Sequence, residues 1–372
     1  MSEKKRILFI CRNFNNMAGG VERMSALIMN QMVNRGFSVC LITWDLIDSK
    51  SHYYLDPSIK WVRLNLGSPE SPASWRLRLQ RQIVLRREAK KFQPNVAIGF
   101  QAGTFIAARL AMIGLKIPTI AAERNSPDLF EYIDKSSLRR GFSNLALTMA
   151  DCITVQLESY RSMYPKVLRD RIITIHNPVF LLKHPPYPNE ATPPPLRILN
   201  VGRLSFQKNQ IFLINAFSLI ANEHPEWILT LVGDGEKRQE IELLVSKLGL
   251  SKRVEIIGAV IDVEAWYRKS AFLAFPSLWE GFPNALVEAF SHGLPAVGLK
   301  ETAGVNELLV DGKSGMLSDN TVNKYSLALQ YMMENIEFRC YAGRMARKLV
   351  IEYDPEKIFN QWDELFSAMS NK

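Results

Sequence analysis

Two glutamates, an arginine and a lysine have the types and spacing that a nucleotide-diphosphate site requires. Glu280 stands before a turn at Gly281, Glu288 follows eight residues after Glu280, and Arg203 and Lys208 lie roughly eighty residues upstream. Two cations can neutralise a diphosphate, and carboxylates can accept hydrogen bonds from the hydroxyl groups of ribose and sugars. The pattern therefore predicts a site for a nucleotide-linked sugar.

A short helix is expected directly after Glu280. Pro283 suits the first helical position, while Gly293 and Pro295 should end the helix near His292. The first N–H groups of a helix, together with its dipole, attract a phosphate. The residues expected to bind the nucleotide here are Phe282, Pro283, Asn284, Ala285, Leu286 and, on the ribose, Glu288.

These segments resemble glycosyltransferase family 4, the retaining transferases of GT-B fold. The resemblance rests on residues 201–204 (Val-Gly-Arg-Leu) with Lys208, on 231–236 (Leu-Val-Gly-Asp-Gly-Glu), and on the two glutamates separated by seven residues. It extends over nearly the whole chain and is strongest from 196 to 315. It implies that Arg203 and Lys208 bind the donor diphosphate, that Glu288 holds the ribose and that Glu280 lies at the transferred sugar. Selectivity for the base is expected near Val260.

The N-terminal half begins with a βαβ pattern. An apolar strand (Arg6–Cys11) is followed by a polar loop, Gly19 and Gly20, a helix to about Asn34 and a strand from Phe37 to Thr43. The G-x-G-x-x-G fingerprint is absent after the first strand, which argues against an NAD-dependent dehydrogenase. Paired glycines can simply mark a turn. The resemblance instead implies that Gly19 and Gly20 let backbone amides approach the donor phosphates across a cleft between two domains.

A second N-terminal candidate is Arg124. It follows a short apolar strand and belongs to the segment Glu-Arg-Asn-Ser-Pro (123–127), which by itself can be a plain turn. Many members of the resembled family carry a histidine here that contacts the transferred sugar. Guanidinium stays charged at all working pH values, so a role that needs neutral imidazole is in doubt. Arg124 is expected to bind a sugar hydroxyl or an acceptor phosphate, with Glu123 orienting it.

The expected fold class is α/β, of GT-B type, with two doubly wound Rossmann-like domains facing a cleft. At 372 residues the chain exceeds the usual size of one core, and 47% hydrophobic residues can fill two. The expected parts are an N-terminal acceptor-binding domain (1–178), a Pro-rich linker (179–195), a C-terminal nucleotide-sugar-binding domain (196–354) and a C-terminal helix (355–372). By resemblance, this helix crosses back to the N-terminal domain.

A net charge of +9 predicts an anionic partner, and the basic residues are densest between Arg76 and Lys91. This stretch can be an ordinary solvated helix. The functional reading is that it contacts an anionic membrane surface or a lipid-linked pyrophosphate acceptor. Nucleic acid is not expected, because no helix-turn-helix, zinc or aromatic RNA-binding pattern accompanies the charge.

The four cysteines have no metal-ligand spacing and the chain has no charged-then-apolar leader, which predicts a cytoplasmic protein. No apolar run reaches the roughly twenty residues needed to cross a bilayer. With the basic stretch on anionic lipid, the expected location is peripheral, on the inner face of the cytoplasmic membrane. No Asp-x-Asp motif follows a strand. We therefore expect no metal and no cofactor beyond the nucleotide-sugar co-substrate. Arg203, Lys208 and the helix N-terminus would carry the charge of the leaving group.

The expected activity is retaining transfer of a hexose or N-acetylhexosamine from a UDP-sugar to a glycan acceptor linked to polyprenyl pyrophosphate, in surface polysaccharide or glycoconjugate synthesis. GDP stays open as the alternative carrier. The expected catalytic residues are Glu280, Arg124, Lys208 and Arg203. A GT-B sugar-nucleotide epimerase would carry further acids and a His-Pro-Arg-like segment, which are absent. A non-catalytic membrane-associated scaffold is the alternative outside enzymes, and the four charged site residues argue against it.

Overall fold

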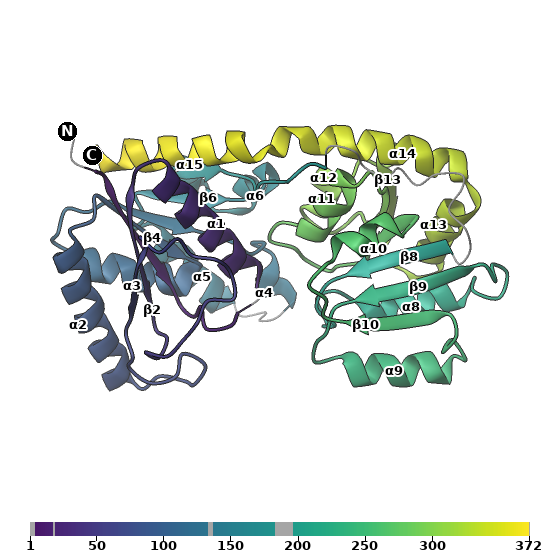
Figure 1. The fold of residues 1–372 in the computed structure, drawn as a ribbon, viewed down its shortest axis with the longest axis horizontal. Coiled ribbons are helices and arrows are strands. Elements are labelled where there is room, and N and C mark those ends of the chain that lie inside the picture. The colour runs from purple at the N-terminus through teal and green to yellow at the C-terminus, as the bar shows by residue number, and fades with distance from the viewer. Residues whose placement is uncertain (1–3, 18, 133–136, 183–195, 372) are drawn as a thin grey trace. The chain divides into compact units, whose positions relative to one another are not determined.

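A computed structural model describes residues 4–17, 19–132, 137–182 and 196–371 (Figure 1). These fall into two compact units, residues 1–177 with 356–372 and residues 178–355. The proline runs at 185–188 and 193–195 of the expected linker lie outside the described residues. Val179, at the start of that linker, is buried in the second unit, and its N–H donates to the carbonyl of Tyr353 (2.8 Å).

The first unit contains a parallel sheet, and within the described residues its strand order is β3-β2-β1-β4-β5-β6-β7. Its central strand β4 is apolar and buried along its whole length, and β1 is buried from Ile7 to Cys11, as expected for a parallel sheet covered by helices. The strands are β1 (Arg6–Cys11), β2 (Ser38–Thr43), β3 (Lys60–Arg63), β4 (Val96–Phe100), β5 (Thr119–Ala122), β6 (Cys152–Val155) and β7 (Ile172–Thr174).

Helices cover both faces of this sheet. The core that α1 and α15 share includes Phe9, Trp362 and Phe366, whereas the core under α2 and α3 includes Leu8 and Leu85. Helix α3 also contacts α5. The helices are α1 (Gly20–Asn34), α2 (Trp75–Phe92), α3 (Ala102–Met112), α4 (Leu129–Tyr132), α5 (Ser137–Leu147), α6 (Glu158–Met163), α7 (Lys166–Arg169) and α15 (Pro355–Ser370).

The second unit is built around another parallel sheet, with the order β10-β9-β8-β11-β12-β13 within the described residues. The strands are β8 (Leu196–Val201), β9 (Trp227–Val232), β10 (Val254–Gly258), β11 (Phe272–Phe275), β12 (Ala296–Leu299) and β13 (Gly315–Ser318). The helices are α8 (Gln210–Ser218), α9 (Arg238–Lys247), α10 (Glu264–Arg268), α11 (Asn284–Ser291), α12 (Val305–Leu308), α13 (Val322–Glu334), α14 (Ile336–Leu349) and the 3-10 turn η1 (Val350–Tyr353).

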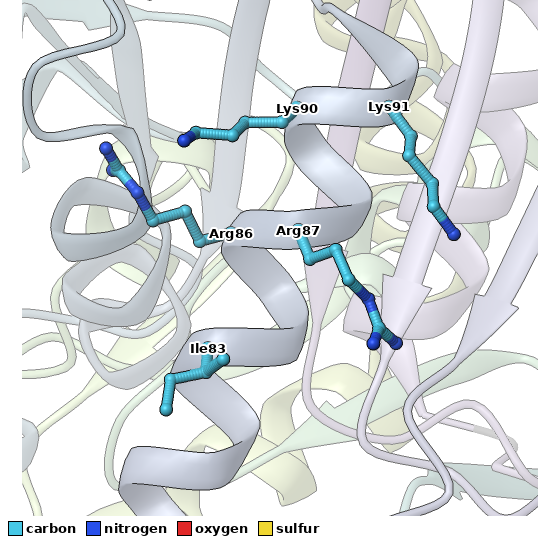
Figure 2. A pocket seen from close by; sticks show the side chains of 5 residues that line it. All are labelled: Ile83, Arg86, Arg87, Lys90 and Lys91. Atoms are coloured by element: carbon cyan, nitrogen blue, oxygen red, sulfur yellow. The ribbon is translucent and has the colours of Figure 1, made fainter.

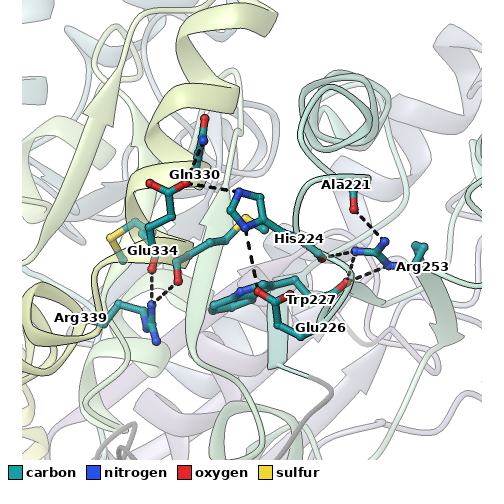
Figure 3. Close-up of polar contacts among 10 residues, drawn as sticks. Ala221, His224, Glu226, Trp227, Arg253, Gln330, Glu334 and Arg339 are labelled. Carbon is teal, nitrogen blue, oxygen red and sulfur yellow. Dashed lines mark hydrogen bonds and ion pairs between the residues drawn. The ribbon is translucent and has the colours of Figure 1, made fainter.

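A polar network fixes the side of the second unit where β9 begins (Figure 3). Arg253 donates to the carbonyls of Ala221, His224 and Trp227 at 2.6–3.0 Å. His224 in turn lies 3.4 Å from the Glu334 carboxylate at the end of α13. Because a guanidinium has five donors, one side chain can satisfy several carbonyls that a chain leaves at a turn.

This network also explains one difference from the expected elements. The sequence pattern favours a helix from Gln210 to about Glu223, but α8 ends at Ser218, and the chain then turns so that the Ala221 carbonyl faces Arg253. Otherwise the alternation of strand and helix follows the sequence pattern. Two doubly wound parallel sheets confirm the expected α/β class. In the part of the chain that the structure describes, no helix is long and apolar enough to cross a bilayer.

Candidate active site

The loops after β8 and β11 meet at the carboxyl edge of the second sheet. The chain runs from β8 to β9 and β10 on one side and then places β11 on the other, so the strand order reverses between β8 and β11. In doubly wound folds, ligands bind in the crevice at such a reversal. Arg203 and Lys208 follow β8, and Glu280 follows β11.

Hydrogen bonds join these two loops. The Gln207 side-chain amide donates to the carbonyl of Trp279 (2.7 Å), and the N–H of Leu278 donates to the carbonyl of Gln207 (2.9 Å). Asn209 reaches the carbonyl of Pro276 (3.3 Å) from a left-handed backbone conformation (φ 57°), which asparagine tolerates better than most residues. Gln207 and Trp279 carry no sequence signal of this role, because a hydrogen bond to a backbone carbonyl does not depend on the type of the accepting residue.

Lys208 and Glu280 contact each other directly. The Lys208 ammonium nitrogen lies 2.5 Å from Oε1 of Glu280, and Glu280 is only 4% exposed. The same nitrogen lies 5.3 Å from the centre of the Phe275 ring. A buried carboxylate requires a paired cation, so each residue fixes the position of the other. The group expected at the diphosphate and the group expected at the sugar therefore lie side by side.

Glycines let the loop that carries Arg203 pack closely. A Cβ added to Gly233 would lie 2.0 Å from the carbonyl oxygen of Gly202, and one added to Gly235 would lie 2.4 Å from that of Leu204. The Leu204 N–H donates to the carbonyl of Asp234 (3.0 Å). The two segments at 201–204 and 231–236 thus pack backbone against backbone, and the exposed Arg203 side chain projects from this junction.

The turn before α11 differs from the expected helix start. Pro283 has φ −77° and ψ 70°, and the Asn284 N–H donates to the Phe282 carbonyl (2.8 Å), which is an inverse γ-turn centred on the proline. The helix begins one residue later, at Asn284. The N–H groups around Asn284, Ala285 and Leu286 were expected to be free for a phosphate. Two of them are hydrogen-bonded within the turn, since Asn284 donates to Phe282 and Leu286 donates to the carbonyl of Pro283 (2.9 Å).

Glu288 is held by a residue that the sequence analysis missed. The buried Tyr267 of α10 donates its hydroxyl to Oε2 of Glu288 (3.1 Å). Nδ1 of His292 donates to the Glu288 carbonyl (2.8 Å), and burial lowers the pKa of His292. Val260 is half-buried just after β10, whose last carbonyl, on Gly258, accepts from Gly233. Four neighbouring strands therefore bring the second-unit candidates to one edge.

In the first unit, the glycine pair lies at the start of α1. Gly19 is the N-cap and Gly20 the first helical residue. A Cβ at Gly19 would lie 2.2 Å from Oε2 of Glu22, so this carboxylate occupies the space beside the glycine. Burial raises the pKa of Glu22. A phosphate at Gly19 would meet Glu22, a neighbour that the glycine pattern did not reveal.

Arg124 lies inside the first unit. Its guanidinium is 5.3 Å from the ring centres of both Phe100 and Trp362. Burial lowers the pKa of Arg124 to about 10, against the opposing effect of Glu123. Burial also raises the pKa of Glu123 to about 7, and the Arg124 charge opposes that rise. Each of these neighbours thus partly compensates the burial of the other.

A cavity of about 220 Å³ opens beside Glu123. In the part of the chain that the structure describes, Glu123 lines this cavity and Arg124 does not. Amides, a hydroxyl and charged groups are the side chains that bind sugar hydroxyls. The polar side chains that line the cavity are Gln101, Glu123, Asn125, Ser126, Arg140, Ser143, Asn144 and Tyr164.

The basic stretch forms α2, and its charges differ in role. Arg81 is buried and donates to the carbonyls of Leu66, Gly67 and Ser68, while Arg86 donates to those of Ala111 and Ile113. Figure 2 shows the side chains that line an open depression of about 440 Å³ on this helix. Its lining residues are Ile83, Arg86, Arg87, Lys90 and Lys91.

Glycosyltransferase family models match both halves of the chain. Residues 18–181 match the model of Glycosyltransferase Family 4, and residues 188–349 match that of Glycosyl transferases group 1. An uncharacterized glycosyltransferase of Haemophilus influenzae is 27% identical over 360 residues, covering 96% of this chain and 99% of that protein.

Two further proteins are similar along the whole chain. A Campylobacter jejuni alpha-1,4-N-acetyl-D-galactosaminyltransferase, named for GalNAc-alpha-(1->4)-GalNAc-alpha-(1->3)-diNAcBac-PP-undecaprenol, is 26% identical and covers 98% of this chain and 99% of its own. Anabaena HepE, solved with UDP and glucose, has a TM-score of 0.80 at 17% identity, covering 97% of this chain and 99% of its own. Because a Glycosyltransferase Family 4 domain is followed by a Glycosyl transferases group 1 domain, the chain belongs to the GT-B glycosyltransferases.

Proposed function

We propose that this glycosyltransferase moves a hexose or N-acetylhexosamine from a UDP-sugar to a glycan carried on polyprenyl pyrophosphate. The observation that carries the proposal is the contact between Lys208 and Glu280 at the strand reversal. In a nucleotide sugar the phosphate and the sugar are joined by one oxygen, so a phosphate-binding cation and a sugar-binding carboxylate must be neighbours. The undecaprenol-linked substrate in the name of the Campylobacter relative supports the choice of acceptor.

In this proposal each second-unit residue has one task. Arg203 and Lys208 neutralise the diphosphate, and Glu280 accepts hydrogen bonds from the sugar. Glu288, held by Tyr267, accepts from the ribose hydroxyls, while Val260 and Phe282 border the base and sugar. Removal of any of these groups should weaken donor use without unfolding the sheet beneath them.

The reaction proceeds with retention of the anomeric configuration. The bond from the anomeric carbon to the UDP oxygen breaks, the acceptor hydroxyl bonds to the same face of that carbon, and its proton passes to the departing phosphate oxygen. Glu280 does not act as a nucleophile, because double displacement needs two close carboxylates across the bond and Glu280 is engaged with Lys208. Determination of the anomeric configuration of the product linkage distinguishes retention from inversion.

The acceptor belongs, in this proposal, to the first unit. Its sugar hydroxyls would meet the polar cavity beside Glu123. Arg124 acts from beneath by opposing the rise in the pKa of Glu123 that burial causes. The lipid carrier would place the enzyme on the inner face of the cytoplasmic membrane, in surface polysaccharide or glycoconjugate synthesis.

We assign part of the membrane contact to α2. Its exposed cations, Arg76, Arg78, Arg87, Lys90 and Lys91, are suited to anionic headgroups. Two of them, Arg87 and Lys91, also pair with Glu88, so the attraction is weaker than the charge count alone indicates. Charge attraction of this kind is screened by salt, and binding through α2 should fall as ionic strength rises.

No metal is part of the proposed mechanism. In the described ranges, no group of three or more His, Cys, Asp and Glu side chains is arranged to hold a metal ion. Arg203 and Lys208 supply the positive charge that a divalent ion supplies elsewhere. Full transfer activity in excess EDTA is the expected result, and activity restored only by added Mg²⁺ or Mn²⁺ would refute it.

The first experiment is a thermal-shift titration with UDP and GDP, because ligand that binds only the folded state raises the melting temperature. Wild type should be stabilised by UDP, and Glu288→Ala should lose this shift. Glu337→Ala, an exposed glutamate on α14, is the matched control. Stabilisation by GDP instead would change the donor class. No shift with either nucleotide at millimolar concentration would contradict the proposal and favour the scaffold alternative, whereas release of free sugar would favour an epimerase.

A further inference from the structure

Helix α5 exposes a row of large apolar side chains. Leu138, Phe142 and Leu145 are 84%, 66% and 66% exposed, and their spacing of four and three residues places them on one side of the helix. Met149, just beyond the helix, is also exposed. Single exposed apolar residues are ordinary, but an aligned row on one helix indicates a contact surface.

The other side of the same helix belongs to the cavity beside Glu123. Arg140, Ser143 and Asn144 line that cavity, and Ala146 and Leu147 are buried against the body of the unit. Helix α5 therefore has one apolar outer face and one inner face that is polar and part of a candidate acceptor site.

The charged residues of α5 itself are of one sign. Residues 137–150 contain Arg139 and Arg140 and no acidic residue, although Arg140 lies 3.5 Å from Glu131 of α4. The neighbouring α3, which contacts α5, exposes Leu110, and Ile113 just after α3 is also exposed. A helix with leucine and phenylalanine on one face and arginine at its polar boundary has the pattern of helices that lie in the plane of a membrane surface.

We infer that α5 lies in the interface of an anionic bilayer, with Leu138, Phe142 and Leu145 among the upper acyl chains and Arg139 at the headgroup level. The inference rests on the proposed function in one respect, which is that the acceptor is carried by a lipid. The inner face of α5 then holds the cavity next to the membrane, where the head of such an acceptor would be found. This contact is apolar and separate from the charged surface of α2.

A second copy of the chain fits this face less well. In a symmetric pair the same helix would pack against itself and would place Arg139 of both copies in one interface. Such like charges repel, whereas anionic lipid headgroups attract them.

The test is sedimentation of the full chain with vesicles of phosphatidylcholine containing about one-third phosphatidylglycerol. The variant Leu138→Ser/Phe142→Ser/Leu145→Ser should partition at least tenfold less than wild type. Leu243→Ser, on the exposed face of α9, is the matched control and should partition as wild type does. Because all these side chains are exposed, melting temperatures should stay unchanged. At 0.5 M salt, residual binding of wild type should persist and depend on α5.

Several outcomes overturn the inference. If the triple variant sediments like wild type while Arg87→Gln/Lys90→Gln does not, the whole membrane contact belongs to α2. If wild type forms dimers that the triple variant abolishes, and both bind vesicles equally, the apolar face of α5 belongs to a second copy of the chain. The UDP thermal shift is measured on the same samples. Its absence would refute the proposed function, while vesicle binding would still decide the role of α5.

Discussion

Glu280 has surroundings that restrict its chemistry closely. It is buried, follows the buried strand β11 and accepts a hydrogen bond from Lys208 at 2.5 Å. A carboxylate in this setting is neutralised and fixed in position, which suits recognition of a sugar better than attack on it. The same contact means that a substitution of either residue has consequences for stability as well as for turnover.

We predict that Lys208→Met and Glu280→Gln each lower kcat by at least a hundredfold. Lys208→Met should also destabilise the second unit by about 3 kcal/mol, because it leaves a buried carboxylate without its cation. The double variant Lys208→Met/Glu280→Gln should recover most of that stability in urea unfolding but none of the turnover. Recovery of turnover would mean that the pair is structural only.

Tyr267 should matter for donor binding and little for the chemical step. Tyr267→Phe removes the hydroxyl that orients Glu288 and is expected to raise KM for the donor roughly tenfold, in line with the loss of one hydrogen bond to a charged group. Steady-state kinetics check this prediction. An unchanged KM with a lowered kcat would place Glu288 at the reacting centre instead of at the ribose.

Glu123 should make stability depend on pH. Its pKa in the folded state is raised from 4.5 to about 7, so the folded protein holds a proton that the unfolded chain releases. Its contribution to stability is complete below about pH 4.5 and is lost as the pH rises through 7. Relative to wild type, Glu123→Gln should therefore gain stability on the order of 2 kcal/mol between pH 5 and pH 8. Urea unfolding at four pH values measures this, and a constant difference would disprove the raised pKa.

The sequence predicted which residues are candidates for the site better than it predicted the contacts that they make. Arg203, Lys208, Glu280 and Glu288 could be chosen because charge and spacing are visible in a sequence. Tyr267 could not, because its partner is twenty-one residues away and nothing in α10 marks a functional hydroxyl. The roles of the site residues remain predictions.

At the scale of elements, the packing of two loops controls where Arg203 lies. Gly235→Ala would bring a Cβ within 2.4 Å of the Leu204 carbonyl oxygen and 2.8 Å of Cγ of Arg203, so the loop must shift. We predict at least a tenfold loss of UDP affinity with a modest fall in melting temperature. Gly312→Ala is the control, since its Cβ would meet nothing within 4 Å and would cost only the strain of φ +67°, about 1 kcal/mol. Equal effects on UDP affinity would contradict this account.

Strands such as β1 and β2 were predictable to within a residue or two, because alternating strands and helices with glycine turns leave strong patterns. The turn at Pro283 was not. A proline before a helix usually occupies the first helical position, and only the hydrogen bond from Asn284 to Phe282 distinguishes a γ-turn from that arrangement. The row of apolar residues on α5 was also missed, since the sequence alone does not tell a buried face from an exposed one.

At the scale of the whole molecule, the four cysteines should differ sharply in reactivity. Burial raises the pKa of Cys40 to about 12 and raises that of Cys11 further, and Cys152 is also buried. Cys340 is half-buried on α14. We predict that a thiol reagent modifies one cysteine of the native protein within minutes and all four in denaturant. Cys340→Ser should abolish the fast phase, and a fast phase that persists would show that a unit opens readily.

The fold class followed from the sequence because two βαβ patterns, each with apolar strands, specify two doubly wound sheets. The family resemblance then connected glycine loops and paired charges that lie far apart in the chain. Composition alone predicted neither the fold class nor the site residues, and it did not say which part of the chain contacts a membrane. A charge of +9 indicates an anionic partner without saying which helix meets it.

Helix α15 has a consequence for how the chain is made. Its Trp362 and Phe366 are fully buried in the core of the first unit, beside Phe9 of β1. During synthesis, all of residues 178–355 leave the ribosome before these side chains do. The unit that is translated first is thus completed last, which reverses the usual order of domain folding. Until then its apolar strands lack part of their cover, and a nonsense mutation close to the C-terminal end would damage the N-terminal unit most.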